Sequence, residues 1–256
     1  MFDFADLAEL LLAAMRKKNN DTADAELESV LEGGLSTSSN VRLVSDLSQR
    51  NPMVAIKSTE SVKVAVLRLL EKSVHRLCVF DADDAFVGVV SFSDILKLVA
   101  DHVGRLDDLL RPSVEAKGLA AKPPVQLSGD RPVLEALALM VERKVSSVAI
   151  VDETDGHLLT AITTTDAKSI IKLKRFEHMR LDCREFAAQV RAKQALEDAH
   201  GRETFPFFAV HKDTSIKTLI AKLVAVRAHR LFVVDRNKPV AVIEIPDIFR
   251  AFRAAA

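Results

Sequence analysis

One pattern occurs three times along the chain, and it limits the folds that the chain can adopt. Each copy is an apolar stretch that ends in aspartate, a polar turn, a second apolar stretch and a further aspartate. The aspartates, in pairs, are Asp81 and Asp94, Asp152 and Asp166, and Asp235 and Asp247. A pattern that returns at this length indicates a repeated structural unit, so the architecture must be assembled from copies of that unit.

Each copy is preceded by a segment with the periodicity of a half-buried helix. Apolar residues recur at i, i+3, i+4, i+7 and i+8 within 62–70, 133–141 and 216–224. Start signals for these helices are Ser61, Asp130 with Pro132 two residues on, and Thr214 or Ser215. Short apolar runs at 54–56, 125–127 and 208–210 come before them. One unit is therefore predicted to run strand, helix, strand, strand, helix, which is an α/β fold.

This order of elements, with Ser/Thr-x-x-Asp at the last strand-to-helix junction, resembles the CBS domain, the regulatory repeat of cystathionine β-synthase. The resemblance covers units at 52–102, 122–174 and 206–253. The spacing of the units, and the His-Arg-Leu sequence in the first and third, most resemble the regulatory gamma subunit of AMP-activated protein kinase. The resemblance implies tandem CBS repeats paired into a Bateman-type module. In that arrangement 122–174 pairs with 206–253 around a cleft.

Residues 1–15 resemble the last strand and helix of a partial fourth repeat, with Asp3-x-x-Asp6 in place of Ser/Thr-x-x-Asp. An ordinary amphipathic helix is the alternative. The unit at 52–102 is expected to pair with this half-unit or with another chain, and an uncovered apolar helix face would recruit a partner. The intervening segments are predicted to be a linker at 16–51, a partly helical connector at 103–121 with a break at Pro112, and a helical connector at 175–205.

Composition argues against several classes of function. Lys and Arg number 36, as do Asp and Glu, and zero net charge disfavours a general binder of nucleic acid or membrane surfaces. The two cysteines, Cys78 and Cys183, fit no metal or disulfide spacing, and no apolar run suggests a signal peptide or a membrane span. No catalytic constellation, Gly-rich phosphate loop or metal-ligand cluster is evident. We expect a protein of the cytoplasm, and also of the nucleus, without enzymatic activity or a resident cofactor.

The aspartates that open the last helix of each unit are candidate ligands, namely Asp94, Asp166 and Asp247. Helix capping is the alternative role, since an aspartate there satisfies exposed N–H groups. Recurrence in three units favours a shared role, because capping alone would accept serine or asparagine equally well. By resemblance to the CBS family, each carboxylate would hold two ribose hydroxyls. Ser91 and Thr163 open the first two motifs, whereas Glu244 opens the third and adds a negative charge there.

Two basic pairs, His75-Arg76 and His229-Arg230, stand in register where a strand begins. A structural histidine beside a strand is the alternative reading for each pair. Arginine offers a planar fork of donors for phosphate, and histidine adds a donor that can be cationic. By the resemblance, both pairs would meet phosphates. Ser146, in the sequence Ser146-Ser147 that replaces the pair in the second unit, would face a nucleotide.

The resemblance implies a regulatory, energy-sensing subunit of a protein kinase complex that binds AMP, ADP or ATP. Its partners would be the kinase's catalytic and scaffold subunits, or a second copy of the chain. The kinase subunit generally lacks the aspartate of the repeat that matches 52–102, so a site usually empty there is expected to be occupied here. The alternative is a structural or interaction protein with degenerate nucleotide sites, which Glu244 and Ser147 favour.

Overall fold

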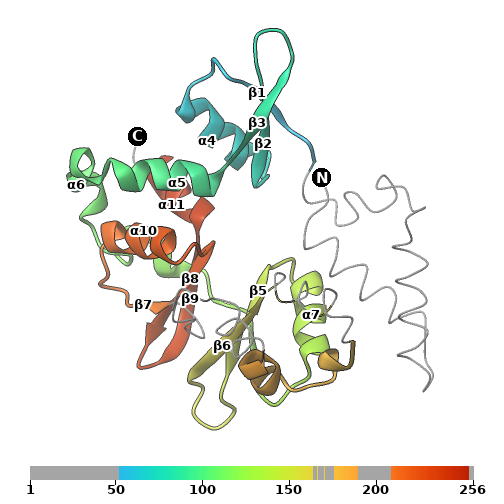
Figure 1. The fold of residues 1–256 in the computed structure, drawn as a ribbon. Helices are drawn as coiled ribbons and strands as arrows, with labels where there is room; N and C mark the ends of the chain where they lie inside the picture. Colours follow the sequence, from blue (N-terminus) through green and yellow to red (C-terminus); the bar gives the residue numbers. More distant parts are fainter. Residues whose placement is uncertain (1–51, 164–165, 167–169, 171–175, 190–208, 254–256) are drawn as a thin grey trace, which may run out of the picture. The chain divides into compact units, whose positions relative to one another are not determined.

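The computed structural model describes residues 52–163, 166, 170, 176–189 and 209–253 (Figure 1). These residues form two compact units. The first, called here the paired unit, consists of residues 52–124 and 209–253 and so contains the first and third repeats. The second-repeat unit consists of the described residues between 125 and 189. The half-unit and linker expected at 1–15 and 16–51 lie outside the described residues.

The first repeat has the predicted order of elements. Strand β1 (Ala55–Lys57) is followed by helix α4 (Val62–Glu71), strands β2 (Arg76–Phe80) and β3 (Phe86–Ser91), and helix α5 (Phe92–Asp101). β2 is the central strand of the sheet, parallel to β1 and antiparallel to β3.

The second repeat begins in the same way. It has strand β4 (Gln126–Ser128), helix α7 (Val133–Glu142), and strands β5 (Ser147–Val151) and β6 (Leu158–Thr163), again with the middle strand parallel to one neighbour and antiparallel to the other. A 3₁₀ turn, η3 (Phe176–Met179), and a helical segment at 183–189 follow among the described residues.

The third repeat has strand β7 (Ala209–Val210), helix α10 (Ile216–Ala225), strands β8 (Arg230–Asp235) and β9 (Lys238–Glu244), and helix α11 (Ile245–Arg253). Its sheet has the same mixed pairing. The fold prediction is therefore confirmed: the chain has three α/β repeats, each built on a mixed three-stranded sheet. The connector after the first repeat contains short helical turns η1 (Val103–Arg105), α6 (Asp107–Leu110) and η2 (Leu119–Ala121), which are interrupted around Pro112 as predicted.

Local chemistry explains where the first helix of each repeat begins and ends. The side chains of Ser61 and Ser215 cap α4 and α10 as predicted. The start predicted at Asp130 is wrong by two residues, because Pro132 is the N-cap of α7, and exposed Asp130 lies 3.6 Å from Arg184 instead. After each helix the chain turns through a left-handed residue, with φ of 53° at Ser73, 53° at Lys144 and 51° at Arg227.

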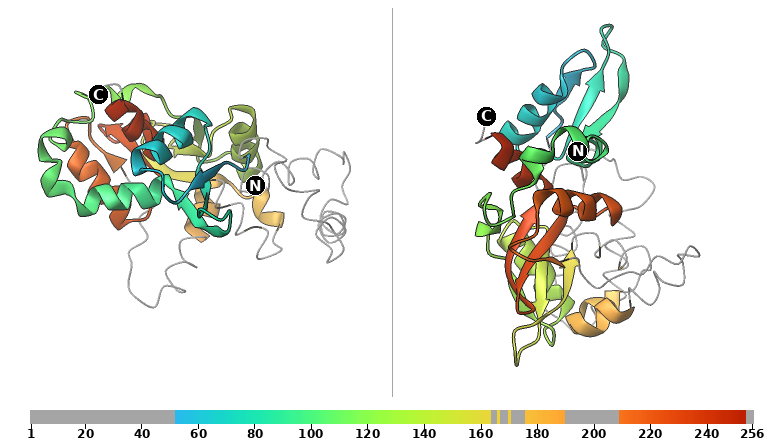
Figure 2. Two further views of the ribbon diagram at one scale, coloured as in Figure 1. Left: turned by 90° about the horizontal axis from the view of Figure 1, so that it is seen from above. Right: turned by 90° about the vertical axis from the view of Figure 1, so that its left-hand side faces the viewer.

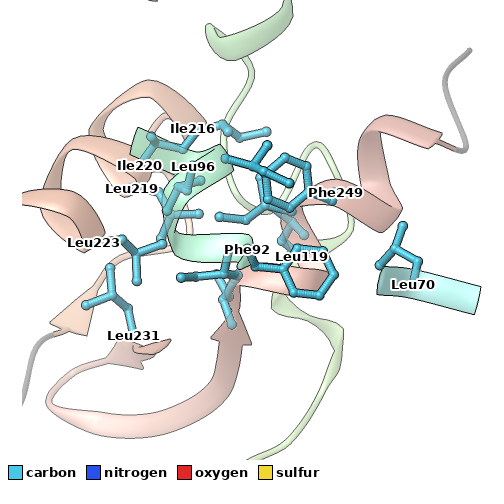
Figure 3. Close-up of a cluster of buried hydrophobic side chains, with 14 of the residues drawn as sticks. Leu70, Phe92, Leu96, Leu119, Ile216, Leu219, Ile220, Leu223, Leu231 and Phe249 are labelled. Atoms are coloured by element: carbon cyan, nitrogen blue, oxygen red, sulfur yellow. The ribbon is translucent and has the colours of Figure 1, made fainter. Parts of the chain in front are cut away.

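The first and third repeats share one hydrophobic core. Helix α5 lies beside α10 and α11 (Figures 1 and 2), and its buried residues Phe92 and Leu96 enter a cluster with residues of both helices (Figure 3). Phe92 stacks on Phe249, with ring centroids 5.6 Å apart. The second repeat has a separate core formed by α7, β5 and β6 with Met179, Cys183 and Phe186.

This packing corrects one expectation. The partner expected for the first repeat was the half-unit at 1–15 or another chain, whereas the third repeat packs on its helix α5 within the same chain. Large apolar side chains of this repeat remain exposed on β3, where Phe86, Val87 and Val89 are 61%, 60% and 48% exposed, and on its helices, where Val62 of α4 and Leu98 of α5 are 47% and 44% exposed. Recruitment of another chain by this repeat stays a prediction. In the part of the chain that the structure describes, no helix is long and apolar enough to cross a membrane.

Candidate functional site

Strand register places the candidate basic residues opposite the first residue of the Ser/Thr-x-x-Asp motif. Arg76 at the start of β2 pairs with Ser91 at the end of β3. Arg230 pairs with Glu244 in the third repeat, and Ser147 pairs with Thr163 in the second. The three repeats therefore bring equivalent positions together, but only the paired unit places a guanidinium at this position.

Asp94 combines a capping role with an unused oxygen. The backbone N–H and the hydroxyl of Ser91 donate to its Oδ2 at 2.8 and 2.6 Å, and Ser91 Oγ accepts from the Asp94 N–H at 3.4 Å. This reciprocal arrangement is a capping box at the start of α5. Among the described residues, no group donates to Oδ1, and the side chain is exposed. Capping and ligand binding are therefore compatible at Asp94.

Asp166 repeats the capping geometry in the second-repeat unit. The N–H and hydroxyl of Thr163 donate to Asp166 Oδ2 at 2.7 and 2.8 Å. Ser146, Thr163 and Asp166 are each half-buried, and neighbouring Ser147 is 9% exposed. This unit holds the motif without a basic pair at the start of its middle strand.

Asp247 differs from Asp94 because both of its carboxylate oxygens are engaged by described residues. The Glu244 N–H donates to Oδ2 at 2.9 Å, and Arg250 Nη1 donates to Oδ1 at 2.7 Å. Arg250 lies three residues further along α11, so the ion pair is local to the helix. Any ligand of Asp247 must compete with an arginine of the same helix.

The basic pairs of the first and third repeats lie close enough for their charges to interact. Ser93, next to Asp94 in sequence, lies 3.2 Å from His229, measured from Oγ to Nδ1. Burial lowers the pKa of His229, and the positive charges of Arg230, His75 and Arg76 lower it further. We call His75, Arg76, His229 and Arg230 the basic cluster. It lies beside the start of α5, where Asp94 is exposed.

Glu244 is an anion within reach of this cluster. Its Oε2 lies 3.1 Å from Lys122 Nζ. Burial opposes ionisation of the carboxyl, but the positive charges of Arg230, Lys122 and His75 outweigh burial, and the pKa of Glu244 is lowered. Glu244 is therefore ionised at neutral pH and offsets part of the positive charge.

Lys122 was not identified as a site residue from the sequence. It lies in the connector, which runs alongside β9: the Val242 N–H donates to the Lys122 carbonyl at 2.9 Å. No motif marks this residue, because its position depends on how the connector packs against a strand more than a hundred residues away.

The predicted site residues thus divide between the two units. The paired unit holds His75, Arg76, Ser91, Asp94, His229, Arg230 and Asp247, and the second-repeat unit holds Ser146, Thr163 and Asp166. Contact between the first and third repeats was not predicted. The predicted pairing of 122–174 with 206–253 would join the two units and stays a prediction. Within the described residues, no group of three or more His, Cys, Asp or Glu side chains could hold a metal ion.

The family model of the CBS domain matches residues 44–101, 116–172 and 203–254. The chain belongs to the CBS-domain family. These matches cover each of the three repeats, so the repeats are CBS units. Residues 91–94 and 244–247, at the starts of α5 and α11, therefore lie within matched CBS units.

Two curated relatives with similar sequences are fungal proteins. The chain is 31% identical over 248 residues to protein sds23 of Aspergillus niger, covering 93% of this chain and 47% of the relative. It is 32% identical over 247 residues to protein SDS23 of Yarrowia lipolytica, covering 93% of this chain and 48% of the relative. The chain spans about half the length of the curated relatives it matches.

Two solved structures share the CBS architecture over most of the chain. Protein MJ1225 of Methanocaldococcus jannaschii, proposed as an archaeal homologue of g-AMPK, matches with a TM-score of 0.65 at 13% identity, over 96% of this chain and 81% of its own. An uncharacterised protein of Pyrococcus horikoshii matches with a TM-score of 0.57 at 15% identity, over 77% and 78%. At these identities the likeness concerns the fold.

Proposed function

We propose that this CBS protein binds an adenine nucleotide (AMP, ADP or ATP) at Asp94 and acts as a regulatory, energy-sensing subunit of a protein kinase complex. The observation that carries the binding proposal is that His229 lies against Ser93, within charge interaction of His75, Arg76 and Arg230, beside an aspartate whose Oδ1 accepts no hydrogen bond from the described residues. The protein would transmit the nucleotide signal without catalysing a reaction itself.

The chemistry of the site suits a nucleotide. Asp94 Oδ1 can accept from ribose hydroxyls while Oδ2 continues to cap α5. Arg76 stands opposite Ser91, and His229 lies against Ser93, so both basic groups adjoin the same helix start. A guanidinium binds phosphate through a fork of donors, and a histidine can add a further donor. Sugar and phosphate could therefore be held within one turn of α5.

Thr163 and Asp166 provide a second candidate site in the other unit. Their geometry matches that of Ser91 and Asp94, with donors to Oδ2 at 2.7 and 2.8 Å. Because Ser146 and Ser147 replace the basic pair, phosphate contacts there must come from other residues. We expect this site to bind AMP more weakly than the Asp94 site does.

The kinase part of the proposal has different support. His-Arg-Leu recurs in the first and third CBS units as it does in the gamma subunit of AMP-activated protein kinase. The fold matches MJ1225, for which a relationship to that subunit has been proposed. A kinase partner would place the protein in the cytoplasm or nucleus.

Isothermal titration of the full chain with AMP, ADP, ATP and adenosine tests the binding proposal. Asp94→Ala should weaken AMP about tenfold or more, since it removes hydrogen bonds to a charged acceptor worth roughly 1.5–3 kcal/mol. Asp101→Ala is the matched control, because Asp101 is an exposed carboxylate at the opposite end of α5. Wild-type protein that binds none of the four ligands, or equal losses in both variants, would refute nucleotide binding at Asp94.

Co-purification tests the kinase proposal separately. A tagged chain expressed in its own host should retain a protein kinase catalytic subunit, and wild type and Asp94→Ala should differ in how AMP changes that retention. If no kinase subunit is retained, the regulatory assignment fails while nucleotide binding can still stand.

A structural or interaction protein is the second candidate. Two ion pairs favour it, Glu244 with Lys122 and Asp247 with Arg250, because both occupy groups that a ligand at the third unit would need. Under this reading no adenine nucleotide would raise the melting temperature, whereas a ligand that binds the folded state must raise it.

A further inference from the structure

The two CBS units of the paired unit present the same site in different states. In the first, Asp94 uses only Oδ2 among the described residues. In the third, Asp247 uses Oδ2 for the Glu244 N–H and Oδ1 for Arg250. In both units Oδ2 of the aspartate accepts the capping hydrogen bond. Among the described residues, Oδ1 of Asp94 is left for a ligand, whereas Oδ1 of Asp247 accepts from Arg250.

The first residue of the motif also makes the first unit more accessible to a ligand than the third. Ser91 stands opposite Arg76, and Glu244 stands opposite Arg230 at the equivalent position of the ladder. Glu244 extends to Lys122, at 3.1 Å, and its side chain is only 27% exposed. The third unit therefore provides its own carboxylate where the first has a small hydroxyl.

The negative charge of Glu244 should oppose the binding of a phosphate group in the third unit. A phosphate group brings about two negative charges at neutral pH and binds by charge-assisted hydrogen bonds to cations. In the third unit, Arg230 and Lys122 already lie close enough to Glu244 to favour its ionised form. An incoming phosphate would have to displace a carboxylate from these cations and then remain near it, and like charges at close range repel.

We propose that Glu244 fills the phosphate subsite of the third CBS unit as a built-in anion, so that the paired unit binds one nucleotide at Asp94 and none at Asp247. This inference rests on the proposed function. It adds which of the two equivalent aspartates, Asp94 or Asp247, can take part in nucleotide binding. Glu244 is in this sense a residue that determines site selectivity, and Lys122 is its counter-ion.

The test counts AMP bound by the full chain in an Asp166→Ala background, which removes the ribose carboxylate of the second unit. With Glu244 in place, titration should give one AMP per chain. Glu244→Ser, which installs the residue type of the first unit, should give two. Adding Asp94→Ala should leave no bound AMP when Glu244 is present and one bound AMP when serine replaces it.

Glu60→Ser is the matched control. Glu60 lies in the same unit, its side chain is 28% exposed, and it pairs with Arg68 at 3.0 Å, so its burial and ion pairing resemble those of Glu244. It should leave one AMP per chain. Glu244→Gln removes the charge but keeps the size of the side chain. If the serine variant does not keep the wild-type melting temperature, the number of AMP molecules bound by Glu244→Gln tests the proposal instead.

The outcomes separate the two proposals. Two AMP bound with Glu244 in place, or one AMP bound to folded chains of both Glu244 variants, would overturn the role of Glu244 and leave nucleotide binding at Asp94 intact. No AMP bound by the Asp166→Ala chain would overturn binding at Asp94 itself. A second AMP gained by Glu60→Ser as well would show that the gain is not specific to Glu244.

Discussion

Phe92 of the first CBS unit and Phe249 of the third stack with their ring planes inclined by 24° and their centroids 5.6 Å apart. Phe92 is the first residue of α5, and Phe249 lies two residues after Asp247 in α11. Both rings are buried in the core that the two repeats share. The contact therefore fixes the two helix starts that carry Asp94 and Asp247 relative to each other.

Replacing Phe249 by alanine should destabilise the paired unit strongly. Loss of a buried phenyl ring leaves a cavity and typically costs about 3–5 kcal/mol. Urea unfolding measures the change in the free energy of unfolding. Phe86→Ala is the control, because Phe86 is 61% exposed and its ring stands edge-on to Phe80, and it should change stability by less than about 1 kcal/mol. Equal effects of the two substitutions would show that the shared core does not depend on this stacking.

The order of elements could be predicted because the periodicity of each segment is local to it. The helices of 62–70, 133–141 and 216–224 carry their own apolar stripe, and serine caps mark two of the three starts. The pairing of repeats could not be predicted in this way. All three units have similar apolar helix faces, so periodicity shows that a helix has a buried face and does not show which repeat covers it.

The site was predictable only where its residues recur. Recurrence identified the aspartates and the His-Arg pairs, and in the structure the charges of both pairs act on His229. Lys122 has no counterpart in a motif, and its place depends on the connector. The Asp247–Arg250 pair, in contrast, could have been anticipated, because residues three apart on a helix are neighbours.

Stability of the paired unit should fall as the pH drops below about 6.5, because of His229. Burial, assisted by the charges of Arg230 and His75, lowers the pKa of His229 below its ordinary value of 6.5. Between the lowered folded pKa and 6.5, the unfolded chain binds more protons, so stability rises with pH across that window and is lost on acidification. Urea unfolding between pH 5 and 8 measures this slope.

Comparison of His229→Gln with wild type isolates the contribution of this histidine. The variant should show a shallower fall in stability on acidification, since glutamine does not titrate. His211→Gln is the control, because His211 is exposed in the same unit. A slope as steep in His229→Gln as in wild type would contradict the assignment.

Cys183 should be inert in the folded protein. Burial raises the pKa of its thiol to about 12, with smaller contributions from Asp182 and Glu135. Since the thiolate is the reactive form, iodoacetamide at pH 8 should leave Cys183 unmodified under native conditions and modify it rapidly in urea. Peptide mass spectrometry measures both states. Rapid native labelling of Cys183 would mean that the core of the second-repeat unit opens readily.

Arg76→Ala should weaken AMP without weakening adenosine. Arg76 stands opposite Ser91, beside Asp94, and is exposed, whereas Arg230 stands opposite Glu244. Loss of a charge-assisted contact to phosphate costs roughly 1.5–3 kcal/mol, which is about a ten- to hundredfold loss of AMP affinity. Adenosine has no phosphate and should bind Arg76→Ala as it binds wild type, whereas Asp94→Ala should weaken both ligands.

Arg230→Ala should change AMP affinity much less than Arg76→Ala does, because Glu244 already lies against Arg230. Titration in the Asp166→Ala background restricts these measurements to the paired unit, and each variant must keep the wild-type melting temperature without ligand. If folded Arg76→Ala binds AMP as tightly as wild type, the phosphate does not lie on the Arg76 side of the basic cluster.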